Sequence, residues 1–87
     1  MLHIDSHEPI EALSTIQKSV PCIIEPLNDK GYADYMWEGK DGIHHHERKQ
    51  WGELAAGLDS VEYQLRTQAQ AHPEAKLGLI VEGVATL

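Results

Sequence analysis

The segment that decides the fold is DYMWEGKDGIHHHERK, residues 34–49. Gly39, Lys40, Asp41 and Gly42 are residues typical of a tight turn, and apolar or aromatic residues that favour strands lie on both sides of them. We therefore expect residues 32–37 and 43–49 to be two antiparallel strands joined by a hairpin turn. The remaining elements are expected to assemble around this hairpin.

The second of these strands carries the residues with the clearest chemistry. Alternation along a strand places Glu47 and Lys49 on one face and Arg48 on the other. Asp34 and Glu47 lie at similar distances from the turn, so we predict that their carboxylates are close enough to share one metal ion. Carboxylates suit Mg²⁺ or Mn²⁺, and a lysine beside them can orient water or stabilise charge on a phosphate. The pattern is typical of metal-dependent phosphodiester hydrolysis.

The N-terminal part predicts a strand, a helix and a second strand. Residues 1–5 form a short strand that ends at Asp5. A helix follows to about Ser19, with Pro9 near its first turn, where a missing N–H group has no cost. Residues 22–25 are short, apolar and β-branched, as in a strand.

The C-terminal part predicts a helix and a last strand. Residues 50–71 are expected to be helical, with a break near Gly57 and a cap for the second segment at Asp59 or Ser60. Residues 77–82 form a continuous apolar run, which is typical of a strand buried on both faces. The helix stripe expected to cover the sheet consists of Trp51, Leu54, Ala55, Leu58, Val61, Leu65 and Ala69.

The predicted fold is therefore an α/β domain with a mixed sheet, in the element order β-α-β-β-β-α-β. Its 87 residues form a single domain. The chain has neither an apolar run of membrane-spanning length nor an N-terminal signal-peptide pattern. Cys22 is the one cysteine, which excludes an intrachain disulfide and predicts a reducing, intracellular location such as the cytoplasm, nucleoid or nucleus. The expected role of Cys22 is that of a small core residue.

The order of these motifs resembles the nuclease domain of the XPF/Hef/Mus81 structure-specific endonucleases, an ERCC4-like branch of the PD-(D/E)XK superfamily. The resemblance extends over nearly the whole chain, from Leu2 to Gly83. The matching motifs are IDSHE with Asp5 and Glu8, ADY with Asp34 and Tyr35, ERK at Glu47, Arg48 and Lys49, Glu53-Leu54, Gln64, and LGLIVEG ending in Glu82-Gly83.

The resemblance implies a restriction-endonuclease-like core that cleaves branched or flapped DNA with a bound Mg²⁺ or Mn²⁺. Asp34 and Glu47 would be metal ligands and Lys49 the catalytic lysine. We also assign Arg48 to the site, where it would contact a phosphate or organise its neighbours. Asp5 joins the same site because it ends an adjacent strand.

The chain departs from the family pattern at several positions. His7 stands where the family has Arg, Ala33 where it has Gly, and Glu53 where it has Asp, and the helix that carries Gln64 is slightly shorter. The family's later strand, its later helices and its helix-hairpin-helix dimer module are absent. The sequence is therefore expected to be an excerpt of a longer protein or a reduced form of the domain.

Each functional interpretation has a simpler alternative. Asp34, Glu47 and Lys49 could form an exposed cross-strand ion pair. Asp5 and Glu8 could belong to a helix cap region, and first-turn Glu53 could complement a helix dipole. Glu82 is expected to be a structural acid.

The aromatic residues also have structural interpretations. His44 and His46 share one strand face and His45 the other, so the three cannot ligate one zinc ion. We expect them at the surface, with His45 beside Glu47. Trp37 and Trp51 are expected in the core or an interface.

The net charge of −7 argues against strong DNA binding by this segment alone. We expect another domain or subunit, in a homo- or heterodimer, to supply the basic surface. The alternatives are a non-catalytic nuclease-fold scaffold subunit and a small α/β binding module.

Overall fold

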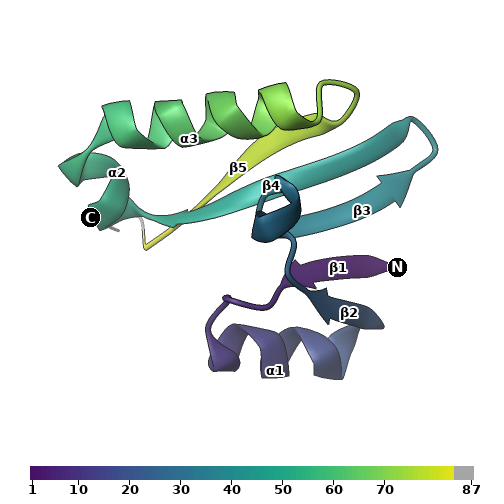
Figure 1. The fold of residues 1–87 in the computed structure, drawn as a ribbon. Helices are drawn as coiled ribbons and strands as arrows, with labels where there is room; N and C mark the ends of the chain where they lie inside the picture. Colours follow the sequence, from purple (N-terminus) through teal and green to yellow (C-terminus); the bar gives the residue numbers. More distant parts are fainter. Residues whose placement is uncertain (84–87) are drawn as a thin grey trace.

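The structure is a computed structural model and describes residues 1–83. Five strands form one mixed sheet in the order β2-β1-β3-β4-β5 (Figure 1). No helix in the described range is long and apolar enough to cross a membrane. The elements are β1 (Leu2–Asp5), α1 (Ile10–Ser19), β2 (Cys22–Glu25), the short 3-10 helix η1 (Asn28–Lys30), β3 (Tyr35–Gly39), β4 (Gly42–Gln50), α2 (Trp51–Ala56), α3 (Leu58–Ala71) and β5 (Lys76–Glu82).

Two helical crossovers cover opposite sides of this sheet. β1 and β2 are parallel and joined through α1, whereas β4 and β5 are parallel and joined through α2 and α3. β1 and β4 run in the same direction, because both are antiparallel to β3. One crossover leads from β1 to the β2 edge of the sheet and the other leads from β4 to the β5 edge. Right-handed connections therefore place their helices on opposite faces. Figure 1 shows α1 on one side of the sheet and α3 on the other. The predicted α/β class and the element order are confirmed, with the long helix divided at Gly57.

The central hairpin forms as the turn residues predicted. Gly39 pairs with Gly42, so Lys40 and Asp41 make a two-residue turn. Gly42 has φ of 116°, which favours glycine because it has no Cβ.

The first strand of this hairpin begins later than predicted. It starts at Tyr35, not at residue 32, so Asp34 lies just before β3. The Tyr32 N–H donates to Leu27 O at 3.1 Å and the Ala33 N–H donates to His45 Nδ1 at 3.0 Å. These bonds replace the strand pairing that alternation suggested.

The apolar core is small and lies on both sides of the sheet. Its buried members are Ile4, Leu27, Ala33, Tyr35, Leu54 and Val61. The predicted helix stripe is correct at Leu54 and Val61. It is wrong at Ala55 and Ala69, which are exposed, and at Trp51 and Leu58, which are 49% and 67% exposed. Trp51 and Leu58 lie at the beginnings of α2 and α3, where the sheet does not cover them.

The predicted cap of the second helical segment is also wrong. Gly57 precedes α3, and no side chain caps it, so Asp59 and Ser60 lie within the helix. The cap occurs instead at α2, where Gln50 and Glu53 bond reciprocally to each other's backbone N–H groups.

β5 is an edge strand, which corrects the prediction of burial on both faces. Only β4 pairs with it, and α3 covers one of its faces. Leu79 and Ile80, which point to opposite faces, are each 39% exposed. A continuous apolar run therefore marks a strand here but not a fully enclosed one.

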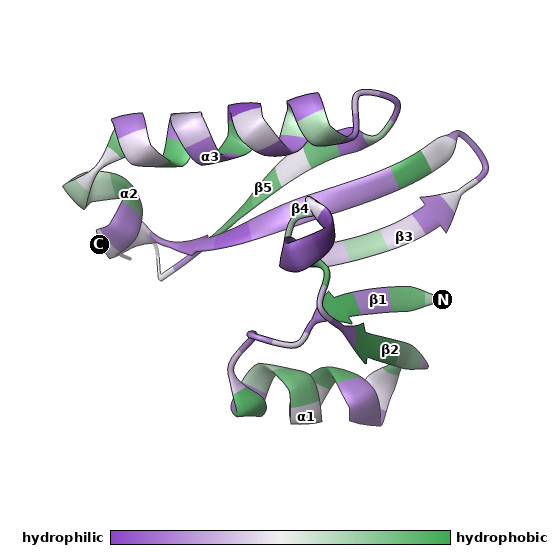
Figure 2. Ribbon diagram, viewed as in Figure 1, coloured by the Kyte–Doolittle hydropathy of each residue, from purple (hydrophilic) through white to green (hydrophobic). Residues whose placement is uncertain are grey.

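β4 is the most polar strand although it lies between two others. Figure 2 shows hydrophilic colouring along most of its length. His45 and Glu47 on this strand are buried, with 0% and 3% exposure. Burying such groups is costly unless partners satisfy them, so their partners indicate what the strand is built to hold.

Candidate functional site

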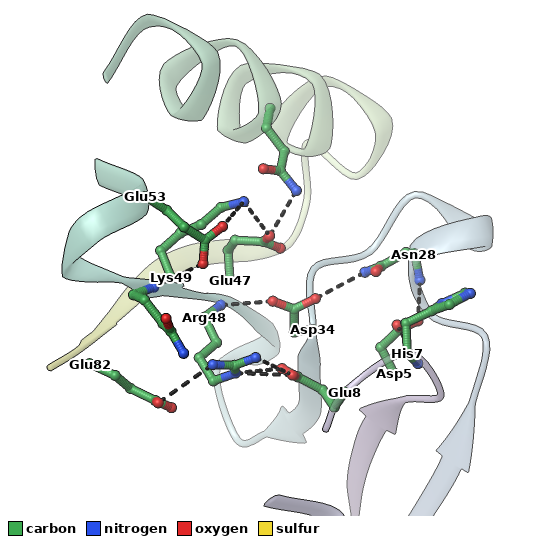
Figure 3. A network of polar contacts seen from close by, with 12 residues as sticks. Asp5, His7, Glu8, Asn28, Asp34, Glu47, Arg48, Lys49, Glu53 and Glu82 are labelled. Atoms are coloured by element: carbon green, nitrogen blue, oxygen red, sulfur yellow. Dashed lines mark hydrogen bonds and ion pairs between the residues drawn. The ribbon is translucent and has the colours of Figure 1, made fainter. Parts of the chain in front are cut away.

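Asp34 and Glu47 come together where the hairpin opens. The β3–β4 ladder ends at the pair Tyr35–His46, and Asp34 and Glu47 are the next residues outward. Asp34 Oδ2 accepts a hydrogen bond of 2.8 Å from the Arg48 backbone N–H, which fixes it against β4. The Asp34 carboxylate lies close enough to Glu47 to raise the pKa of the Glu47 carboxyl group. Figure 3 shows the two side chains next to each other. That they share one metal ion stays a prediction.

Two glutamines of α3 hold the Glu47 carboxylate. Gln64 Nε2 donates to Oε2 at 2.7 Å, and Gln68 Nε2 donates to Oε1 at 3.0 Å. Burial raises the pKa of Glu47, the Gln68 hydrogen bond opposes that rise, and the nearby Asp34 carboxylate adds to it. The amide donors thus stabilise an anion that its surroundings would otherwise disfavour.

Lys49 lies on the same strand face as Glu47, as alternation predicted. Its Nζ is 3.6 Å from Glu47 Oε2 and 3.9 Å from Glu53 Oε2. Lys49 is mostly buried, and its positive charge lowers the pKa of Glu47. Glu53 completes the capping box of α2, and its carboxylate also faces Lys49. A role of Glu53 in the site stays a prediction. The Lys49 ammonium thus lies beside the carboxylates of Glu47 and Glu53.

Arg48 projects to the opposite face, where its guanidinium is already bound. Its Nε donates to both Glu8 carboxylate oxygens at 3.0–3.1 Å, and Nη1 lies 3.5 Å from Glu82 Oε2. The hydrogen bond to Glu8 raises the pKa of Arg48. The pKa of nearby Tyr35 is raised to about 12, first by burial and then by the charge of Glu8. Arg48 therefore contributes its backbone to the Asp34 side and its side chain to an ion-pair network beneath the sheet.

Asp5 organises the chain around Asp34. Its Oδ2 accepts from the His7 N–H at 2.9 Å, and its Oδ1 accepts from the Asn28 N–H at 2.8 Å. The Asp5 backbone N–H donates to Asp34 O at 2.8 Å, and Asn28 Nδ2 donates to Asp34 Oδ1 at 3.3 Å. Asp5 is fully buried, so it positions the loop that carries Asn28 and the segment that carries Asp34.

His45 is buried beside Glu47, which corrects the expectation of a surface residue. Its Nδ1 accepts from the Ala33 N–H, so the proton of the neutral ring lies on Nε2. Within residues 1–83, that Nε2 has no hydrogen-bond partner. Burial, followed by the charges of His72 and His46, lowers the pKa of His45. The ring is therefore a neutral part of the interior.

His44 and His46 lie on the opposite face and stack on Trp37. The ring centroids are 5.3 Å and 4.8 Å from the indole. The expectation that these two share a face apart from His45 is correct. This cluster lies on the face away from Glu47 and Lys49.

Asp34 and Glu47 offer carboxylate oxygens, the kind of ligand that Mg²⁺ and Mn²⁺ prefer. In residues 1–83, no three His, Cys, Asp or Glu side chains form a group that could hold a metal ion. Mg²⁺ keeps several waters and is commonly bound through only one or two carboxylates. Each carboxylate has about four lone-pair sites, and the hydrogen bonds above leave acceptor capacity on both. Two facing carboxylates repel each other, and a divalent cation would relieve that repulsion.

Sequence reasoning missed two partners and left a third without a role. Asn28 reads as a turn residue, yet it holds Asp34. Gln68 lies on the buried side of α3, where a polar residue in the apolar stripe was the available signal. Gln64 was matched to a family motif, and its bond to Glu47 now gives it a physical role.

Comparisons of the chain with models of known protein families, with curated proteins and with solved structures found no match.

Proposed function

We propose that this protein is a metal-dependent endonuclease that hydrolyses phosphodiester bonds of DNA. The observation that carries the proposal is the arrangement of Asp34, Glu47 and Lys49 on one side of β4. Two adjacent carboxylates with an ammonium beside them supply the charges that phosphodiester hydrolysis requires. The preference for branched or flapped DNA rests on the sequence resemblance alone, as does the restriction-endonuclease-like classification of the fold.

Asp34 and Glu47 would hold the Mg²⁺ or Mn²⁺. When bound, the ion lowers the pKa of a coordinated water and polarises a phosphoryl oxygen. Gln64 and Gln68 keep the Glu47 carboxylate in one orientation, and the Arg48 backbone N–H and Asn28 do the same for Asp34. Such fixed donors hold the ligands in place before the substrate arrives.

Lys49 supplies the positive charge at the reacting phosphate. Its ammonium carries three N–H donors and cannot accept a hydrogen bond. In the proposed role it orients the attacking water or stabilises the charge that develops on the phosphate oxygens. Arg48 keeps β4 fixed through Glu8 and Glu82, so its role in the site is structural.

DNA is the proposed partner, bound with help from another domain or subunit in a homo- or heterodimer. The net charge of −7 supports that requirement, because a phosphate backbone is repelled by an acidic surface. The free thiol of Cys22 supports a location inside the cell.

The test is a cleavage assay on fork, flap and duplex DNA with Mg²⁺, Mn²⁺ or EDTA. We expect cleavage with either metal and none with EDTA. Lys49→Ala should lower the cleavage rate by about 10²–10³-fold, as loss of one charge-stabilising donor does in other enzymes, while Mg²⁺ binding measured by calorimetry is retained. Glu47→Ala should lose both cleavage and Mg²⁺ binding.

Lys40→Ala is the matched control, because Lys40 lies exposed in the hairpin turn. It should cleave at the parental rate. Parental cleavage by Lys49→Ala would reject the proposed role of the ERK segment. DNA binding without cleavage under every metal condition would favour the scaffold subunit, and absence of both would favour the α/β binding module.

A further inference from the structure

A cavity of about 340 Å³ lies between η1 and α3. Its volume falls within the range of small-molecule sites. Three of its lining residues are the amides that hold the site: Gln64 and Gln68 bond Glu47, and Asn28 bonds Asp34. A ligand in this cavity would therefore be separated from the proposed reaction centre by these amide side chains.

Two tyrosines give the cavity aromatic walls. Tyr32 is stacked on His72, with ring centroids 3.6 Å apart and planes within 4°. Tyr63 projects from α3 and is 73% exposed, so its ring is free to contact a ligand. The cavity thus combines one fixed aromatic ring with one accessible aromatic ring.

The chemistry of the lining selects a flat, neutral, polar ring over an anion. None of the lining residues is Lys or Arg. Side-chain amides in the lining carry both hydrogen-bond donors and acceptors. A nucleobase matches this combination, because it stacks on aromatic rings and carries ring-edge donors and acceptors.

A second cavity also has Gln64 in its lining, and it contains the positively charged side chain that the first cavity lacks, that of Lys49. It measures about 310 Å³ and is lined by Lys49 and Glu53 among others, with Gln64 common to both cavities. A phosphate beside Lys49 and a base beside Tyr63 would thus occupy adjoining spaces. The arrangement accommodates one nucleotide with its base turned away from a partner strand.

We propose that the cavity lined by Tyr32, Tyr63, Gln64 and Gln68 binds an unpaired nucleobase of the DNA strand, next to the phosphodiester that is attacked. This inference rests on the proposed endonuclease function and adds a site that binds a nucleobase. Stacking and amide contacts would also supply affinity that the acidic surface cannot supply.

The test compares flap DNA carrying normal bases with the same DNA carrying one abasic site, moved along the nucleotides that flank the cut. Binding is measured with Ca²⁺ and cleavage with Mg²⁺. For the parent, one abasic position should weaken binding by roughly 5- to 150-fold, the range that corresponds to loss of one stacked base. Tyr63→Ala should weaken binding of normal DNA by a similar factor and should not respond to the abasic site.

Two further variants separate stacking from unrelated damage. Tyr63→Phe should keep the parental response, because it keeps the ring. Gln70→Ala, on an exposed part of α3 outside the cavity, should match the parent. Circular dichroism should show all variants folded, since Tyr63 is largely exposed.

Cleavage that is equally fast for normal and abasic DNA at every position, or unchanged in Tyr63→Ala, would overturn the base-binding cavity and leave the endonuclease proposal standing. Failure of the parent to cleave any of these substrates with Mg²⁺ or Mn²⁺ would overturn both proposals. Loss of binding in Tyr63→Phe equal to that in Tyr63→Ala would show that the hydroxyl, not stacking, matters and would also reject the inference.

Discussion

Two polar side chains of β4, those of His45 and Glu47, are buried. Their hydrogen-bond partners lie far away along the chain. Glu47 depends on two glutamines of α3, and His45 depends on the Ala33 backbone. Strand alternation placed both side chains on the same face correctly. It could not show that α3 covers that face, because the partners lie far along the chain and include polar residues that sequence patterns assign to the surface.

His45 should make stability depend on pH. Its folded-state pKa is lowered, by burial first and by His72 and His46 next, with Glu74 acting in the opposite direction. A lowered pKa means that the folded state resists protonation, so this contribution to stability is complete above about pH 6.5, the usual pKa of histidine. It is lost as pH falls below that value, because the unfolded chain then takes up a proton more readily.

The variant His45→Asn isolates this effect, because an Asn Oδ1 can still accept the bond from Ala33 N–H. At pH 7.5 it should cost about 1–3 kcal/mol of unfolding free energy through lost packing. The difference from the parent should shrink as pH is lowered from 7.5 to 5, measured by urea unfolding. A constant difference across this range would show that His45 is not the titrating group.

One apolar stripe along α2 and α3 was predicted to cover the sheet. In the structure some residues of this stripe are buried and others are exposed. Leu54→Ala should lower the unfolding free energy by roughly 2–5 kcal/mol, because Leu54 is 8% exposed and its truncation leaves a cavity. Leu58→Ala is the matched control, and it should change stability by less than about 0.5 kcal/mol because Leu58 is 67% exposed. Chemical denaturation measures both, and equal losses would mean that the covered face is misassigned.

β5 shows the limit of reading burial from an apolar run. The sequence of residues 77–82 identified a strand, but the number of neighbouring strands is a property of the whole sheet. Within this strand, Gly78 is required for another reason. A Cβ at this position would lie 2.5 Å from Cε1 of His46, whose ring stacks on Trp37 and so cannot move freely.

Gly78→Ala should therefore lower stability by about 1–3 kcal/mol, the usual cost of overpacking. The His46→Ala variant removes the ring, so adding Gly78→Ala to it should cost less than about 0.5 kcal/mol. A double-mutant cycle of urea unfolding measures this coupling. Additive losses would show that the glycine is needed for its backbone and not for the space it leaves to His46.

At the scale of the whole molecule, the sequence predicted the α/β class, the element order and the central hairpin, because local turns and periodicity determine these features. The contacts among Asn28, Asp34, Glu47 and the glutamines of α3 depend on long-range packing, which periodicity does not encode.

Charge is the other property of the whole molecule. Acidic residues outnumber Lys and Arg by 14 to 7. In the part of the chain that the structure describes, five of the Lys and Arg side chains are in ion pairs: Lys30, Arg48, Lys49, Arg66 and Lys76.

For the proposed complex with DNA, this charge distribution predicts a shallow salt dependence of binding. Each phosphate neutralised by a cationic side chain contributes about −0.9 to the slope of log K against log salt concentration. With Lys49 as the cation at the site and Arg48 held by Glu8 and Glu82 on the other face, the slope should be about −1 to −2. Fluorescence anisotropy with flap DNA, Ca²⁺ and increasing KCl measures it. Lys49→Ala should reduce the magnitude by about one, whereas Lys40→Ala should leave it unchanged. A slope steeper than about −4 would contradict this expectation, since it would require more phosphate contacts than the basic residues of one chain can supply near the site.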